Sequence, residues 1–147
     1  MNSIHLGWSP FFEGQLAPGD RSRYSVGRIL EERKNCYVLL TEDGREVLAS
    51  LAGKLQYEAS GRGDLPSVGD WACASVRVEE RRATIHRLLE RRTKIARKGA
   101  GSVIDEQVLA ANVDTVLLVN SLNQDLNPRR IERYLALVWE SGARPVL

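Results

Sequence analysis

Residues 36–51, CYVLLTEDGREVLASL, predict a β-hairpin and with it the class of fold. The runs 36–40 and 46–51 are rich in apolar residues, and the Glu42-Asp43-Gly44 segment between them is a turn signal. An isolated hairpin is only marginally stable in water, so further strands are expected on both sides of it.

The neighbouring sequence supplies such strands. Upstream, YSVGRIL (24–30) alternates between apolar and polar residues apart from its last pair, and a polar turn (32–35) joins it to the hairpin. Downstream, after a Gly-rich polar stretch (53–66), VGDWACASV (68–76) and ATIHRL (83–88) add a fourth and a fifth strand. Five short strands in about 70 residues predict a mainly β fold, a five-stranded OB-fold barrel. An SH3-like barrel is the alternative, because it gives much the same pattern.

Two short segments flank the predicted barrel. An apolar group within residues 1–20 predicts a packing arm, and the basic, glycine-containing stretch 91–102 is interpreted as a linker. The predicted division of the chain is an arm (1–20), an OB-fold domain (21–92), a linker or domain start (93–112) and an α/β segment (113–147).

The last segment has the pattern of a strand, a helix and a second strand. The continuous apolar run 114–119 is typical of a strand buried on both faces of a parallel sheet. Asn127 as N-cap, Pro128 at the first helical position and Gly142 after the last turn delimit a helix, and 143–147 begins another strand. Such a unit needs further strands beside it, so we expect these residues to be the truncated beginning of a larger domain.

The net charge of +2 conceals a strongly basic segment. Residues 1–76 carry 8 basic and 10 acidic side chains and residues 99–147 carry 4 and 6, so each part has a net charge of −2. Residues 77–98 carry 9 basic and 3 acidic side chains, a net charge of +6. This concentration favours a polyanion-binding face, with a solvated charged strand as the alternative.

A barrel with basic elements can bind nucleic acid in a groove where cations neutralise phosphates and aromatic rings stack on bases. The Arg33-Lys34-Asn35 turn is the best candidate for a probing loop, because loop tips carry function, with a solvated turn as the alternative. Tyr37 and Tyr57 are candidates for stacking or for packing, and Trp71 is predicted to lie in the core. The residues predicted to bind RNA are Arg33, Lys34, Asn35, Arg62, Arg87, Arg91, Arg92, Lys94, Arg97 and Lys98.

Motifs for catalysis are absent from the sequence. The phosphate-cradling GxxxxGK[ST] loop does not occur, nor do the NKxD and DxxG motifs of GTPases, and no residues predict a nucleophile with its base. The cysteines and histidines of the chain could ligate a metal, but their spacing in the sequence is not that of a metal site: Cys36, Cys73, His5 and His86. We therefore expect no catalytic residue, no cofactor site and no metal site within the 147 residues.

The sequence also predicts the compartment. No apolar run approaches the ~20 residues of a membrane helix. Glu13 and Asp20 interrupt any secretory signal. Two cysteines are too few for a disulfide framework, and we predict that Cys36 and Cys73 are core residues. A cytoplasmic protein without a membrane partner is expected.

Several ordered strings resemble one known family. They are LGW (6–8) followed by FF (11–12), VGDW (68–71), the basic run from Arg91 to Lys98, EQVLAANVD (106–114) and LNQDLNPRRIERYLAL (122–137), which continues into ESGA (140–143). The chain resembles the RsgA (YjeQ/YloQ) family of bacterial, ribosome small-subunit-dependent GTPases over essentially its whole length.

The resemblance implies an N-terminal OB domain, a circularly permuted P-loop GTPase domain and a C-terminal zinc-binding domain. It implies that a longer parent protein hydrolyses GTP late in the maturation of the 30S subunit, and that hydrolysis is coupled to release. The expected partners are the 30S subunit and 16S rRNA, not DNA. The GTP and zinc sites are expected downstream of Leu147, which leaves the 147 residues inactive by themselves. The alternative is an OB-like or SH3-like module that binds a protein or an oligosaccharide and has no GTPase role.

Overall fold

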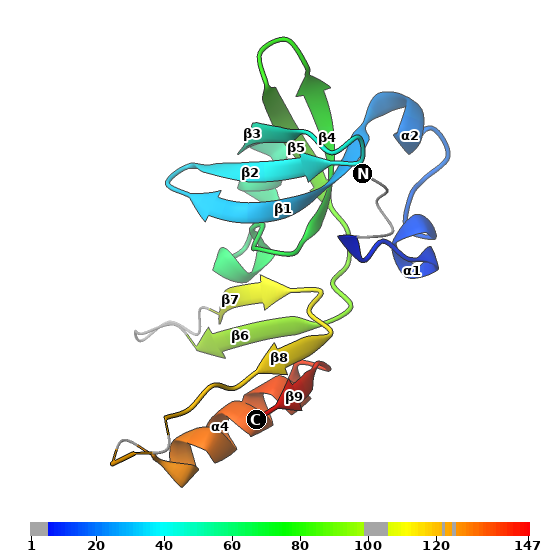
Figure 1. Ribbon diagram of the computed structural model, residues 1–147. Coiled ribbons are helices and arrows are strands. Elements are labelled where there is room, and N and C mark those ends of the chain that lie inside the picture. Colours follow the sequence, from blue (N-terminus) through cyan, green and yellow to red (C-terminus); the bar gives the residue numbers. More distant parts are fainter. Residues whose placement is uncertain (1–5, 99–105, 122, 125) are drawn as a thin grey trace.

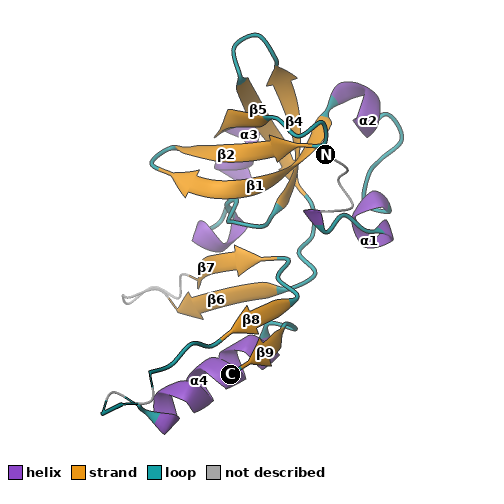
Figure 2. Ribbon diagram, in the orientation of Figure 1, coloured by secondary structure: helices purple, strands orange, loops and turns teal. Residues whose placement is uncertain are grey.

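The computed structural model describes residues 6–98, 106–121, 123–124 and 126–147. Its largest part is a closed five-stranded barrel in the order β1-β2-β3-β5-β4 (Figure 1; Figure 2). The strands are β1 (Ser25–Arg33), β2 (Cys36–Thr41), β3 (Glu46–Leu51), β4 (Trp71–Arg77) and β5 (Arg82–Leu88). All neighbours are antiparallel except β3 and β5, which run parallel from Leu48↔Arg82 to Leu51↔Ile85. This crossover confirms the predicted OB-type barrel, because a simple meander closed by antiparallel neighbours does not produce it.

Strand β1 is longer than its sequence pattern predicted. The alternation fails at Ile29 and Leu30 because the pairing with β2 shifts register between Ile29 and Glu31. This bulge leaves Ile29 buried and Leu30 exposed, and the strand then continues to Arg33. The polar turn predicted over 32–35 is therefore only Lys34-Asn35, and Asn35 has the positive φ (64°) that a tight hairpin turn requires.

The barrel buries side chains on two faces of β4. Ala72 and Ala74 point into the barrel, where they pack with Ile29, Leu39 and Ile85. Trp71 and Cys73 point to the other side and are covered by the N-terminal arm. Burial on both faces explains why the sequence of β4 does not alternate.

The arm carries two short helices, α1 (Pro10–Glu13) and α2 (Asp20–Arg23). Phe12 of α1 is buried against Trp71, and the ring of Trp8 meets that of Trp71 edge-on at 4.8 Å between centroids. The predicted packing arm and the predicted core position of Trp71 are confirmed.

The connection between β3 and β4, predicted as a polar stretch, contains helical turns. It holds α3 (Gly53–Glu58) and a 3₁₀ turn η2 (Arg62–Asp64). Neither helix has a residue that is buried, so no apolar periodicity marked them in the sequence.

The interpretation of residues 91–102 as a linker is wrong for its central part. Residues 94–98 form β6 (Lys94–Lys98), which pairs antiparallel with β7 (Glu106–Ala111). This hairpin lies between the barrel and the C-terminal elements (Figure 1). A strand with polar residues at both ends and one register shift lacks the alternation by which the other strands were recognised.

The C-terminal elements are β8 (Thr115–Leu117), α4 (Pro128–Glu140) and β9 (Arg144–Val146), and β8 pairs parallel with β9. The predicted caps of α4 are confirmed, because the Asn127 side chain accepts a hydrogen bond from the Arg130 N–H (3.1 Å) and Gly142 has φ 83°. The run 114–119 is not buried on both faces within the described structure, in which Leu117 is 69% and Val119 91% exposed, and this agrees with the expectation that it is one strand of a larger sheet. Among the described helices, none combines the length and the apolar character needed to cross a membrane.

A junction of residues 68–70 with residues 111–112 joins the barrel to the β6–β7 hairpin. The Ala111 N–H donates to Val68 O (2.8 Å), and the Gly69 N–H donates to Ile29 O in β1 (2.8 Å). The side-chain amide of Asn112 donates to Gly69 O (3.1 Å). Gly69 has φ 91°, and a Cβ at this position would lie 2.0 Å from Ala111 O.

We therefore expect Gly69→Ala to destabilise the protein by about 3 kcal/mol, because the left-handed backbone and the contact with the Ala111 carbonyl both disfavour a side chain. Urea unfolding measures the loss. Gly53→Ala is the matched control, because a Cβ there meets no atom within 4 Å, and it should stay within about 1 kcal/mol of the wild type. Equal stability of the two variants would contradict the role of the junction.

Candidate nucleic-acid interface

The described part of the chain has a polar groove of about 450 Å³ between the β1–β2 hairpin and the β6–β7 hairpin, hereafter the groove. Its walls come from the end of β1 and the start of β2, from β3 and α3, from the connection to β4, and from β7. The lining residues are Glu32, Arg33, Asn35, Tyr37, Ser50, Leu51, Gln56, Arg62, Leu65, Pro66, Ser67, Gln107 and Val108. Segments more than 70 residues apart in sequence, such as Glu32 and Gln107, therefore share one site.

Three of the residues predicted to bind RNA line the groove: Arg33, Asn35 and Arg62. Arg33 forms an exposed ion pair with Glu31 (2.8 Å), which raises the pKa of the Arg33 guanidinium and keeps it fully charged. Lys34 is exposed at the tip of the hairpin, and in the described residues no acidic side chain pairs with it. The hairpin therefore offers one unpaired cation, Lys34, and one cation, Arg33, that forms an exposed two-bond pair with Glu31 beside the groove.

Arg97, another predicted residue, stands beside the groove on β6. Its Nε donates to Oε1 of Gln107 (3.0 Å), and Gln107 lines the groove. Lys98 lies in the same strand, but its side chain is outside the described residues. Positive charge thus flanks the groove from the barrel side and from the β6–β7 side.

Arg87 and Arg91 hold the fold together. Arg87 donates to Asp20 (2.6 Å) and to Gln15 O (3.2 Å), which fastens the N-terminal arm to β5. Arg91 donates through Nε and Nη2 to the two carboxylate oxygens of Asp70 (2.8 and 2.7 Å). It also donates to the carbonyls of Gly63 (2.7 Å) and Leu65 (2.8 Å). Neither guanidinium lines the groove.

Sequence reasoning did not single out Asp70, the partner of Arg91. Its side chain is fully buried and also accepts from the Ser67 N–H (2.8 Å). A buried carboxylate needs a cation and further hydrogen bonds, so an Asp inside the run VGDWACASV was the available signal.

The remaining predicted cations also have acidic neighbours. Arg92 pairs with Asp114, and Lys94 pairs with Glu106 (2.6 Å). Four of the nine cations of the segment 77–98 are thus paired with acids from other parts of the chain, namely Arg87, Arg91, Arg92 and Lys94. Its cations without a described ion pair are Arg81, Arg82 and Arg97.

The aromatic and sulfur-containing candidates have separate positions. Tyr37 is 7% exposed at the floor of the groove, and burial, together with the Glu32 carboxylate, raises the pKa of its phenol. Tyr57, on α3, is 91% exposed, so it does not pack as one of the alternatives expected. Cys73 is buried but Cys36 is only half-buried, so the prediction of two core cysteines is confirmed for Cys73 alone.

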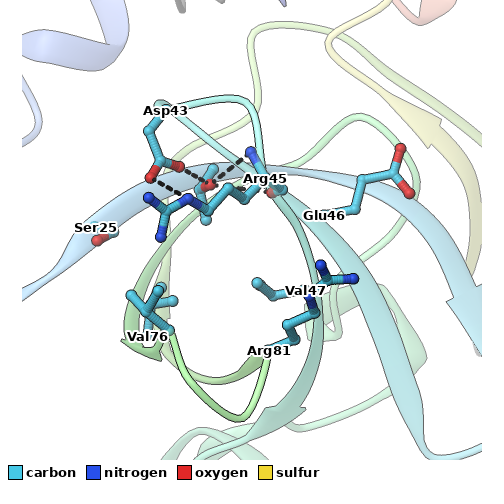
Figure 3. Close-up of a pocket in the computed structure, with 9 residues that line it drawn as sticks. Ser25, Asp43, Arg45, Glu46, Val47, Val76 and Arg81 are labelled. Carbon is cyan, nitrogen blue, oxygen red and sulfur yellow. Dashed lines mark hydrogen bonds and ion pairs between the residues drawn. The ribbon is translucent and has the colours of Figure 1, made fainter.

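A second hollow of about 570 Å³ lies at the end of the barrel where β2 turns into β3 (Figure 3). Asp43 and Arg45 pair across its rim (3.1 Å), and Thr41 donates to Asp43. Arg81 reaches it from the β4–β5 loop, and Val47 and Val76 also line it (Figure 3). None of the predicted RNA-binding residues lines this hollow.

Neither zinc nor GTP fits the residues present. Within residues 6–98, 106–121, 123–124 and 126–147, no three His, Cys, Asp or Glu side chains gather into a metal site. The sequence also lacks the glycine-rich loop that wraps nucleotide phosphates. We therefore assign no described residue to either group.

Comparison with known proteins identifies relatives of the whole chain. The sequence profile of the family described as RsgA GTPase matches residues 88–147. The small ribosomal subunit biogenesis GTPase RsgA of Opitutus terrae is 42% identical over 155 residues, which covers 100% of this chain and 42% of that protein. RsgA 2 of Vibrio parahaemolyticus is 42% identical and covers 97% of this chain and 36% of its own length. The chain therefore spans about two fifths of the length of the relatives it matches.

Solved structures share the fold. YjeQ from Thermotoga maritima aligns with a TM-score of 0.60 at 20% identity, over 82% of this chain and 39% of that one. YloQ, described as a circularly permuted GTPase, aligns with a TM-score of 0.60 at 20% identity, over 84% of this chain and 39% of that one. These likenesses support the barrel followed by an α/β segment.

The ion pair of Asp70 with Arg91 leads to a stability prediction. Asp70→Asn should cost about 3–5 kcal/mol, because it leaves the partly buried Arg91 charge without compensation. Glu31→Gln, which removes an exposed pair with Arg33, should cost less than about 1 kcal/mol. Urea unfolding of both variants measures the difference, and a small effect of Asp70→Asn would show that the buried pair is dispensable.

Proposed function

The chain belongs to the RsgA family, and from this premise we propose that it supplies the rRNA-binding barrel of a GTPase that matures the small ribosomal subunit. The proposal is carried by the 42% identity, over the whole chain, to a protein named small ribosomal subunit biogenesis GTPase. Its ligand in this proposal is 16S rRNA within the 30S subunit, and its compartment is the cytoplasm, where those subunits assemble.

The geometry supports a reader of phosphates and RNA shape. OB-fold barrels bind oligonucleotides on the face of strands 2 and 3 and with the loops between strands 1 and 2 and between strands 4 and 5. In this chain the first of these loops carries Lys34 at its tip and Arg33 beside it, next to the groove. Because folded RNA is recognised mostly through its backbone, a few well-placed cations are sufficient for this role.

The enzymatic part of the proposal concerns the longer protein. We place GTP hydrolysis, coupled to release from the 30S subunit late in maturation, in a circularly permuted GTPase domain that begins near residue 113. Residues 21–92 are then the RNA-binding domain, 1–20 its arm and 93–112 the segment that joins the two. GTP and zinc bind, in this proposal, to segments that follow Leu147 in the family.

The hairpin assignment is tested by co-sedimentation with purified 30S subunits at about 50 and about 200 mM salt. The Arg33→Glu/Lys34→Glu variant should pellet less than the wild type. It should also lower the slope of log affinity against log salt by about 2, because two phosphate contacts are lost.

The matched control is Arg129→Glu/Arg133→Glu on α4, which changes the net charge by the same amount. It should pellet like the wild type. Equal loss in both variants would show a general effect of charge, and no loss in the hairpin variant would contradict its contact with RNA.

Nucleotide binding by the 147 residues provides a second test. Isothermal titration with GTP should show no binding, because the chain lacks the phosphate-cradling loop and the guanine-reading motif. The same titration on the longer protein should show binding. Saturable binding of GTP by the 147 residues would overturn the assignment of the nucleotide site.

A further inference from the structure

The size of the groove limits what can enter it. Its volume of about 450 Å³ lies in the range of sites that enclose small ligands. An RNA duplex is much wider than such a hollow and can only lie across it. A single nucleotide displaced from the duplex is of a size that this volume can hold.

The lining of the groove carries more hydrogen-bonding groups than phosphate recognition requires. Asn35, Gln56 and Gln107 bring side-chain amides from the β1–β2 turn, α3 and β7. In the described structure the amides of Asn35 and Gln56 make no hydrogen bond, and Gln107 uses only its oxygen, as the acceptor from Arg97. An amide offers a donor and an acceptor together, which matches the edge of a base, whereas phosphate oxygens only accept.

Glu32 favours a base over a phosphate as the occupant of the groove. Its carboxylate lines the groove and repels phosphate, but it can accept a hydrogen bond from the exocyclic amino group of a base. Of the cations, Arg33 and Arg62 line the groove together with Glu32, whereas Lys34 at the hairpin tip and Arg97 on β6 stand beside it. In this arrangement a base can enter beside Glu32 while the flanking phosphates meet Arg33, Lys34 and Arg97.

We propose that the groove holds one unpaired nucleotide of the bound RNA and selects a base with an exocyclic amino group. The inference deepens the proposed function and rests on it. Arg33 and Lys34 neutralise the flanking phosphates, the amides of Gln56 and Gln107 bond the base edge, and Glu32 accepts from its amino group. Uridine, which has no amino group, is the disfavoured base.

The experiment compares RNA hairpins that differ only in one bulged nucleotide. Fluorescence anisotropy with the 147-residue chain measures affinity for a fully paired hairpin and for the same hairpin with a bulged A, C, G or U. The bulged A, C and G forms should bind at least about fivefold more tightly than the paired form, and the bulged U form should gain less. The preference should persist as salt is raised, whereas the affinity common to all the RNAs should fall.

Variants distinguish the contribution of the groove to RNA binding from that of the surrounding cations. Gln56→Ala and Glu32→Ala should reduce the preference for a bulged A over the paired hairpin to less than about twofold. The matched controls Gln124→Ala and Glu132→Ala lie outside the groove and should keep the preference. All four positions are exposed, so thermal unfolding should show intact folds.

Two results would overturn the inference in different ways. Equal, salt-sensitive binding of bulged and paired hairpins would refute the nucleotide site and leave the RNA-binding function standing. Absence of salt-sensitive binding to every RNA, including 30S subunits, would refute the proposed function and the inference with it.

Discussion

Burial of the Asp70 carboxylate is the constraint on which the rest of the structure depends. A fully buried charge is tolerated only with a cation and further hydrogen bonds, and Arg91 supplies the cation. The same guanidinium gathers the carbonyls of Gly63 and Leu65, so it fixes the connection that forms one wall of the groove. Asp70 also ends the turn through Gly69 that binds residues 111–112. One ion pair thus orders the entry to β4, the exit from β5 and the approach of the β6–β7 hairpin.

The barrel could be predicted from sequence because its strands are short runs rich in apolar residues and its turns carry turn residues. The departures have physical causes. Helix α3 buries no residue and β6 has a register shift, so neither shows the periodicity on which the prediction relied. The caps of α4 were predictable because Asn127 and Gly142 act locally, within one turn of the helix.

Charge was harder to interpret than pattern. The segment 77–98 has a net charge of +6 in the sequence, but Asp20, Asp70, Glu106 and Asp114 lie against it in the fold. A sum over neighbouring residues cannot include acids that arrive from 12 or more positions away. The cations left available are those at loop tips, such as Lys34, and those beside the groove, such as Arg97. The cations available to bind a ligand are therefore decided by the ion pairs that the fold creates, and not by the net charge of one segment of the sequence.

The separation of Asp70 from Arg91 in sequence has a consequence for the newly made protein. Synthesis adds about 5–20 residues per second, so Arg91 is added about 1–4 s after Asp70. During that interval the partner that compensates the buried carboxylate in the fold is missing. The junction closes later still, when residues 111–112 have emerged. Vectorial synthesis thus makes the strands of the β1–β2–β3 meander available before β4 and β5, and the junction with the β6–β7 hairpin is the last of these contacts to be completed.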